Sequence, residues 1–316
     1  MRVTLLYSAS SRDSPPALRM RYLREALEER GFEVKEINLP KSRLTYLRPK
    51  KVTDEVVLFS APPAYVAFAA RGTKLVGDLR DPWDVYAREG GLLKGLATAP
   101  IVARYLGKLR RSDLLVATTR SIAEHYERLT GKEVLVIENG TDPEALKCDE
   151  DRRERGALLI ADFSNPYLPV RPFLGVAREM ELDLALVGPG SEKYGGVGRV
   201  PYERLKEVGC KYSIGVIPRP WRGKTYEMTI PLKTYDYMAL GLCVFAYGPP
   251  AGELKRLVEE EGIGVYASSP EELKAKLKEC LDVCPEAGAR ARRLAEEKYD
   301  RRALSRKYAD YLASSL

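Results

Sequence analysis

Two side chains three positions apart, Lys233 and Asp236, have the types and the spacing needed to hold a nucleotide sugar. They lie between Pro231 and Gly241, where apolar residues at helical spacing predict a short helix that presents both side chains on one face. A lysine can neutralise a phosphate, and a carboxylate can accept hydrogen bonds from the two hydroxyls of a ribose. An ordinary ion pair on a helix surface would have the same spacing, so the pattern alone leaves both interpretations open.

Basic residues that precede this helix could hold the phosphates of the same ligand. Arg219, Arg222 and Lys224 follow a strand predicted at 213–217, and positive charge there suits a diphosphate. Arg171 begins another predicted helix, where the free backbone N–H groups also favour a phosphate. A flexible, solvated basic loop is the alternative for the residues after 217.

A second polar cluster, at 78–84, follows another predicted strand. Open α/β sheets bind their ligands at the carboxyl ends of strands, which is where this cluster lies. Asp81 is the candidate catalytic residue at the reacting centre, and the ring of Trp83 could stack on a sugar. A structural Arg-Asp clamp is the alternative, and Asp78 and Arg80 are expected only to brace the loop.

The loop after the first predicted strand, at 2–7, is rich in hydroxyl groups and contains no glycine between residues 8 and 14. A dinucleotide fingerprint needs glycines for the close approach of the backbone to a pyrophosphate, so this class of site is excluded. Ser10 and Ser11 could contact an acceptor instead. A plain polar loop explains them equally well.

The segment at 231–248 also resembles the Lys-x-x-Glu-Tyr-x-Ala-x-Gly-x-Pro-Val signature of glycosyltransferase family 4 and related retaining GT-B glycosyltransferases. The residues on the pattern are Lys233, Tyr237, Ala239, Gly241 and Val244, with Asp236 in place of Glu and Cys243 in place of Pro. The stretch at 78–84 and the Asn-Gly-x-Asp turn at 139–142 look like segments of the same family. The resemblance implies that Asp236 binds the ribose of the donor nucleotide, while its diphosphate is held by Lys233, Arg219 and Arg171.

One position departs from the family pattern. The family's second acid, which contacts hydroxyls of the donor sugar, would stand at position 228, where this chain has Met228. Glu227 is adjacent and is expected to take its place if the loop shifts. The departure leaves open a non-catalytic sugar-nucleotide-binding or scaffold relative, beside other GT-B reactions such as those of a phosphorylase or a sugar-nucleotide epimerase.

The resemblance implies a hexosyltransferase-like enzyme that moves a sugar from a nucleotide-diphosphate donor to an acceptor hydroxyl with retention at the anomeric carbon. The nucleotide sugar would be the co-substrate, and the acceptor would be a glycan, a lipid-linked hydroxyl or a small molecule. Positive charge near the diphosphate would stabilise the leaving group. We therefore expect no obligatory metal and no further cofactor.

Alternating strands and helices predict an α/β fold with two Rossmann-like parallel-sheet domains. The resemblance implies the GT-B architecture, in which the two domains face each other across a cleft. An acceptor-binding domain is predicted at 1–147, a charged linker at 148–156 and a nucleotide-sugar-binding domain at 157–316. The last helix, at 301–316, is expected to cross back to the N-terminal domain, as in other GT-B proteins.

The chain carries a formal net charge of +7, which favours anionic partners. No pattern of a nucleic-acid-binding module accompanies the charge, so nucleic acid is not expected as a partner. The stretch at 94–111 is basic, and a helix after Pro100 would align Arg104, Lys108 and Arg111. Such a face either lies on an anionic membrane surface or is simply solvated.

Composition also indicates the environment of the chain. Charged residues make up 31% of its 316 residues and Gln is absent, which is typical of a protein from a thermophile. No apolar run is long enough to span a bilayer. We therefore expect a cytoplasmic protein, either free or peripheral to the inner face of the membrane.

Five scattered cysteines fit a reducing compartment, in which they would be buried thiols. Cys280 and Cys284 lie one helical turn apart, but no further cysteine is near them in the sequence. The single histidine, His125, lies in a predicted helix and is expected at the surface. A zinc site is therefore not expected.

Overall fold

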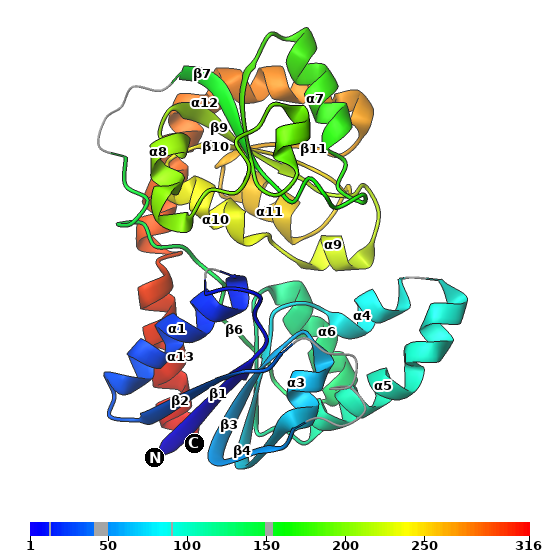
Figure 1. Cartoon of the computed structure of the whole chain (residues 1–316), viewed down its shortest axis with the longest axis vertical. Helices are drawn as coiled ribbons and strands as arrows, with labels where there is room; N and C mark the ends of the chain where they lie inside the picture. The colour runs from blue at the N-terminus through cyan, green and yellow to red at the C-terminus, as the bar shows by residue number, and fades with distance from the viewer. Residues whose placement is uncertain (13, 41–49, 90, 149–153) are drawn as a thin grey trace. The chain divides into compact units, whose positions relative to one another are not determined.

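The protein divides into two compact units in a computed structural model that describes residues 1–12, 14–40, 50–89, 91–148 and 154–316. The first unit contains Met1–Asn139 together with Arg301–Leu316, and the second contains Gly140–Asp300. Figure 1 shows the elements of each unit with their labels. Each unit has its own parallel sheet and its own hydrophobic core, as expected of a domain.

In the described part of the first unit, six parallel strands form one sheet in the order β2-β1-β3-β4-β5-β6. The order changes direction between β1 and β3, because β2 lies on one side of β1 and the later strands lie on the other. The elements are β1 (Arg2–Tyr7), α1 (Pro15–Glu28), β2 (Glu33–Asn38), β3 (Val52–Ala61), α3 (Ala64–Ala69), β4 (Ala70–Leu79), α4 (Trp83–Arg88), α5 (Leu92–Arg110), β5 (Leu114–Ala117), α6 (Arg120–Thr130), β6 (Leu135–Val136) and α13 (Arg301–Ser315).

The second unit has a five-stranded parallel sheet within the residues described, in the order β11-β10-β9-β7-β8. Its order changes direction between β7 and β9. The elements are β7 (Glu154–Ile160), α7 (Val170–Glu179), β8 (Asp183–Val187), α8 (Leu205–Gly209), β9 (Tyr212–Pro218), α9 (Lys224–Met228), α10 (Leu232–Ala239), β10 (Cys243–Tyr247), α11 (Glu253–Glu260), β11 (Gly264–Ala267) and α12 (Leu273–Glu297), with short 3-10 helices at Ser191–Tyr194, Tyr202–Arg204 and Pro270–Glu272.

Strand β10 shows why the second sheet is covered on both faces. All its side chains are buried, and neighbouring ones point to opposite sides. Val244 and Ala246 join the core that contains α10 and α11, whereas Phe245 and Tyr247 join the core that contains α7. A continuous apolar run without alternation is what a parallel strand between two helical layers requires.

The last helix, α13, belongs to the first unit although it follows the second unit in the sequence. Its buried side chains include Leu304, Tyr308 and Leu312, which recur at a helical spacing and share one core with Met20 and Leu23 of α1. Figure 1 shows α13 running beside α1. The chain therefore passes between the units twice, after Asn139 and after Asp300.

The first passage comes earlier than the predicted end of the N-terminal domain at 147. Thr141 pairs with Asp300, and Leu146 is buried in a core of the second unit, so residues 140–147 pack with that unit. Of the predicted linker at 148–156, residues 149–153 lie outside the described residues. Strand β7 already begins at Glu154.

Helix α5 also differs from its predicted bounds. It begins at Leu92 and passes through Pro100, whereas the sequence predicted a start after that proline. A proline inside a helix removes one N–H donor, but Pro100 is exposed, so water can satisfy the carbonyl group that loses its partner. Among the helices that the structure describes, none is both long and apolar enough to cross a lipid bilayer.

The cysteines contradict part of the prediction, because Cys148 and Cys210 form a disulfide. The two are 62 residues apart, so their spacing gave no sign of the pairing. Disulfides are rare in reducing compartments, apart from intracellular proteins of hyperthermophiles. The expectation of free thiols holds for Cys243, Cys280 and Cys284, which are buried.

Removing the disulfide by the double substitution Cys148→Ser and Cys210→Ser should lower the free energy of unfolding by about 2–4 kcal/mol. The bond closes a loop of 62 residues and therefore restricts the unfolded chain. Denaturant unfolding with and without a thiol reductant measures the effect. The wild type should lose stability on reduction and the double variant should not; equal sensitivity of the two proteins would contradict the pairing.

Candidate functional site

Helix α10 is fixed to the two central strands of the second unit by Tyr237. The Tyr237 hydroxyl accepts a hydrogen bond from the N–H of Ile160 at the end of β7 (2.8 Å) and donates one to the carbonyl of Val216 in β9 (3.2 Å). A Cβ at Gly215 would lie 2.3 Å from the Tyr237 side chain, so only glycine leaves room for the ring. Since the strand order changes direction between β7 and β9, these contacts place α10 where open α/β sheets bind ligands.

Lys233 reaches the carboxyl end of β7 from the same helix. Its Nζ donates to the carbonyl oxygen of Ile160 at 2.5 Å, and it forms no ion pair with Asp236 or any other described acid. The interpretation of the spacing as a surface ion pair is therefore wrong. Burial, and then the nearby charge of Arg219, lower the pKa of Lys233 to about 7.

Arg219 directly follows β9 and supplies the second cation at this edge of the sheet. Its Nη2 donates to the carbonyl oxygens of Tyr226 (3.3 Å) and Thr229 (3.4 Å) and to the Thr229 hydroxyl, and its guanidinium lies over the Tyr226 ring. Lys233 and Arg219 thus place positive charge at the carboxyl ends of β7 and β9. Such a pair can bind a diphosphate, because an anion would offset the mutual repulsion that lowers the Lys233 pKa.

Asp236 is buried and faces a different part of the unit. Its Oδ1 accepts hydrogen bonds from the Thr141 hydroxyl (2.9 Å) and the Tyr202 hydroxyl (3.2 Å). The carboxylate therefore connects α10 to the turn at Thr141, with which the second unit begins. Sequence reasoning missed both donors: Thr141 stood in a recognised Asn-Gly turn without an assigned role, and nothing in the sequence singles out Tyr202.

The remaining two donor-site candidates do not join this group. Arg171 is exposed in the first turn of α7 and makes no hydrogen bond or ion pair to a described residue. Glu227 lies on α9 and pairs with Lys224 (2.7 Å). Met228 is only 3% exposed, so position 228 belongs to the core and cannot present a polar group there. The predicted roles of Arg171 and Glu227 stay predictions.

In the first unit, the cluster after β4 is braced by buried polar contacts. Asp78 is fully buried and accepts hydrogen bonds from Arg19 Nε (2.9 Å) and the Ser60 hydroxyl (2.7 Å). Arg80 donates to Ser60 (2.8 Å) and to the carbonyl oxygen of Pro62. Asp78 raises the pKa of Arg19 against the opposing effect of burial. These contacts match the bracing role predicted for Asp78 and Arg80.

Asp81 differs from its neighbours because its partly buried carboxylate forms no hydrogen bond or ion pair with any residue that the structure describes. It therefore remains available to a ligand. Trp83 opens α4, and its ring meets the ring of Tyr105 edge-on, with centroids 5.4 Å apart. The predicted acceptor residues Ser10 and Ser11 follow β1, at the other side of the strand-order reversal, and both are exposed.

His125 is not the plain surface residue that the sequence predicted. Its Nε2 lies 3.0 Å from Oδ2 of Asp84, which is fully buried, and the histidine side chain is 18% exposed. Burial raises the pKa of Asp84, but the hydrogen bond and charge of His125 lower this pKa by more than burial raises it. The net shift is therefore downward. The two residues are 41 positions apart, and only the packing of α4 near α6 brings them together.

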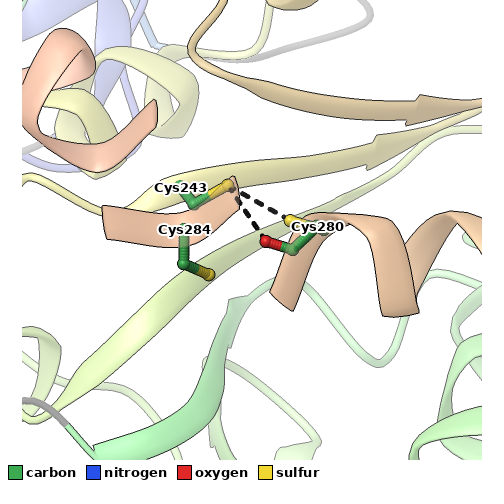
Figure 2. Close-up of side chains that lie close together, drawn as sticks. All are labelled: Cys243, Cys280 and Cys284. Atoms are coloured by element: carbon green, nitrogen blue, oxygen red, sulfur yellow. Dashed lines mark hydrogen bonds between the residues drawn. The ribbon is translucent and has the colours of Figure 1, made fainter. Parts of the chain in front are cut away.

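Three cysteines form a compact group in the second unit, which Figure 2 shows. Cys243 begins β10, and its Sγ lies 3.2 Å from Sγ of Cys280 on α12; Cys284 completes the group one turn later. Cys243 is thus the third member of the group, although it lies 37 residues from Cys280 in the sequence. Hydrogen bonds from Cys243 and then Cys280 lower the pKa of Cys284. The thiols could act as metal ligands, but no fourth His, Cys, Asp or Glu of the described chain joins them, and structural zinc sites take four.

Comparisons with known proteins give one match to a family model and several matches to solved structures. Residues 169–312 match the family model described as glycosyl transferase-like. The chain matches none of the curated protein sequences with which it was compared.

Solved structures match along nearly the whole chain. Sucrose-phosphate synthase from Thermosynechococcus elongatus is 12% identical with a TM-score of 0.74, over 99% of this chain and 98% of that one. WaaG, a glycosyltransferase involved in lipopolysaccharide biosynthesis, is 13% identical with a TM-score of 0.68, over 98% and 99%. An α-glucosyltransferase solved in complex with UDP and a 13-mer DNA is 8% identical with a TM-score of 0.64, over 99% of both chains.

The strand orders and the matches agree with the architecture that the sequence predicted. At these identities, the solved structures establish the fold, and the family model covers the part of the chain that contains α10, Lys233 and Arg219. The chain thus has the GT-B fold, and its residues 169–312 match the family model described as glycosyl transferase-like.

Proposed function

We propose that the protein is a glycosyltransferase that moves a hexosyl group from a nucleotide-diphosphate sugar to an acceptor hydroxyl, with retention and without an obligatory metal. The observation that carries the proposal is the pair of cations, Lys233 and Arg219, at the carboxyl ends of β7 and β9. One structure of the same fold, an α-glucosyltransferase, contains UDP, which supports a nucleotide donor.

In this proposal the second unit holds the donor. Lys233 and Arg219 bind the diphosphate and stabilise its charge as the bond between the sugar and the phosphate breaks. Asp236, which Thr141 and Tyr202 hold in place, accepts hydrogen bonds from the ribose hydroxyls. Arg171 and Glu227 contact the phosphates and the sugar as these bind.

The first unit holds the acceptor, a glycan, a lipid-linked hydroxyl or a small molecule. Asp81 contacts the reacting hydroxyl, because its carboxylate forms no hydrogen bond or ion pair with a described residue, whereas Asp78 is bound to Arg19 and Asp84 to His125. Trp83, Ser10 and Ser11 line the acceptor's path. Contact of residues 94–111 with an anionic membrane surface would bring a lipid-linked acceptor to this unit.

A non-catalytic nucleotide-sugar-binding protein is the second candidate. Met228 favours it, because a side chain buried in the core leaves the donor sugar without the acid that the family pattern has at this position. This candidate retains donor binding and lacks turnover, so binding and catalysis need separate tests.

The substitution Lys233→Met should weaken the binding of a nucleoside diphosphate about 10- to 100-fold, because a hydrogen bond to a charged group contributes roughly 1.5–3 kcal/mol. A panel of nucleoside diphosphates and their sugars is titrated by calorimetry, and melting temperatures report on folding. Lys211→Met is the matched control, since Lys211 is exposed at the amino end of β9. Equal affinities of the wild type and Lys233→Met would rule out the donor site.

Donor binding should weaken as the pH rises from 7 to 9, by up to about tenfold per pH unit. The pKa of free Lys233 is lowered to about 7, and a bound diphosphate stabilises its charged form, so binding takes up a proton that becomes scarcer at high pH. A nucleotide-diphosphate sugar is the suitable probe, because its own charge is constant in this range. Lys233→Arg should flatten the profile, since Arg219 and the new arginine both stay charged; an unchanged slope in this variant would refute the assignment.

Asp81→Asn should lower the rate of donor hydrolysis or sugar transfer by about 100-fold or more while the Kd of the donor stays the same. The reason is that Asp81 is proposed to contact the acceptor and not the nucleotide. Asp113→Asn is the control, because Asp113 lies outside the cluster after β4. A wild type that binds the donor but shows no turnover with any acceptor would support the non-catalytic candidate instead.

A further inference from the structure

A cationic cavity of about 360 Å³ lies in the first unit, apart from the residues discussed so far. Helix α3 contributes Phe68, strand β4 contributes Arg71 and Leu75, and the second half of α5 with the residue that follows it contributes the remaining three. These are Arg104, Lys108 and Arg111, the three cations that the sequence predicted on one helix face. On this face Lys108 is only 8% exposed, whereas Arg104 and Arg111 are exposed.

The four cations around the cavity have no acidic partner. Lys108 Nζ and Arg71 Nη1 both donate to the carbonyl oxygen of Ala70, each at 2.8 Å, so their charges lie side by side. The Arg104 guanidinium lies over the Phe68 ring, 4.3 Å from its centroid. No carboxylate of the described chain pairs with Arg71, Arg104, Lys108 or Arg111.

This arrangement is costly for the empty protein. Burial, and then the charges of Arg71 and Arg111, lower the pKa of Lys108 to about 8. Elsewhere in the same unit, the buried cation Arg19 forms an ion pair with the buried carboxylate of Asp78, so the two charges balance. Unbalanced positive charge around a cavity indicates a place for an anion.

The cavity lies far from the proposed acceptor residues. Arg71 is at the amino end of β4, whereas Asp78 and Asp81 are at its carboxyl end. A strand advances about 3.3 Å per residue, so the two ends of β4 are on the order of 25 Å apart. The cavity is therefore not part of the site at the carboxyl ends of the strands.

We propose that this cavity is a second ligand site, which binds a phosphomonoester group through Arg71, Arg104, Lys108 and Arg111. Guanidinium groups present paired N–H donors that match the oxygen atoms of a phosphate, and the ammonium group of Lys108 adds a third direction of contact. The volume exceeds that of a phosphate ion alone, and Phe68 and Leu75 supply an apolar wall for a small organic group attached to the phosphate. The phosphomonoester belongs either to a free metabolite or to a lipid headgroup.

The test uses the intact protein and three probes: sulfate, glycerol 3-phosphate, and phosphatidylcholine vesicles with or without phosphatidic acid. Calorimetry follows the soluble probes, and co-sedimentation follows the vesicles. Arg104→Met and Arg111→Met change exposed side chains, so both variants should fold, and each should weaken binding about 10- to 100-fold. Lys108→Met is a third variant, which is used if its melting temperature is unchanged.

Arg110→Met is the matched control. It removes the same charge from the same helix, but Arg110 points to the carbonyl oxygen of Leu129 and does not line the cavity. Binding by Arg110→Met should stay within about twofold of the wild type, because it retains every cavity cation. An equal loss in Arg110→Met and Arg111→Met would show attraction to net charge only and would overturn the proposal.

The pH dependence gives a second readout. Sulfate keeps its charge between pH 7 and 10, and the lowered pKa of Lys108 at the cavity wall lies within this range. Sulfate affinity should therefore fall above about pH 8 in the wild type, as Lys108 loses its proton.

The outcomes separate this site from the donor site. Binding of glycerol 3-phosphate would assign a free phosphomonoester, and binding only to vesicles with phosphatidic acid would assign a lipid headgroup. Lys233→Met should bind either probe as the wild type does, so a failed donor site leaves this proposal standing. Absence of binding to all three probes in the wild type would overturn it.

Discussion

The Tyr237 hydroxyl joins β7, β9 and α10 at the place where the strand order of the second unit changes direction. It accepts from one backbone N–H and donates to one backbone carbonyl, so these bonds fix the helix against both strands at once. Gly215 makes this possible by leaving space for the ring. The position of Lys233 one turn earlier follows from this anchor, because the helix carries Lys233 to the end of β7. The position of Lys233 in the proposed donor site thus depends on one buried hydroxyl.

Electrostatics distinguishes structural charges from available ones. Asp78 and Arg19 neutralise each other in the core of the first unit, and Asp84 is matched by His125. By contrast, the carbonyl oxygen of Ile160 is the one hydrogen-bond partner of Lys233 among the described residues, and the pKa shifts of Lys233 and Lys108 both reflect burial next to other cations. Neighbouring buried cations repel each other and lower the stability of the folded protein, and a bound anion would offset this repulsion. Such a surplus of positive charge occurs at two separate places, one in each unit.

The cysteines divide into two groups with different physical roles. Cys148 and Cys210 connect the chain before β7 to the end of α8, which restricts the unfolded state. The other three lie in the apolar layer between β10 and α12, where they pack as small hydrophobic side chains and share weak hydrogen bonds. A covalent link in one part of the unit and free thiols in another show that burial and proximity, and not the number of cysteines, decide their state.

Local patterns in the sequence were sufficient to predict the fold class and the order of the elements. The apolar run at 242–247 and the helical spacing before it predicted β10 and α10, and the alternation of such segments predicted two parallel sheets. The sequence also predicted that Arg104, Lys108 and Arg111 share a face, since helical geometry alone requires this. Segments near 78–84 were placed correctly at the end of a strand.

Only the tertiary structure decided which of these residues meet. The distance along the chain gave no sign that His125 would reach Asp84, that Cys243 would join Cys280, or that Arg71 would complete a cavity on α5. The tertiary structure also gives Lys233 and Asp236 different partners, although they lie three positions apart on one helix. Lys233 contacts the end of β7, and Asp236 contacts the turn at Thr141. These contacts depend on how strands order themselves in a sheet and how helices pack on it. Local spacing does not encode those long-range relations, because they arise from burial and hydrogen-bond satisfaction summed over each whole unit.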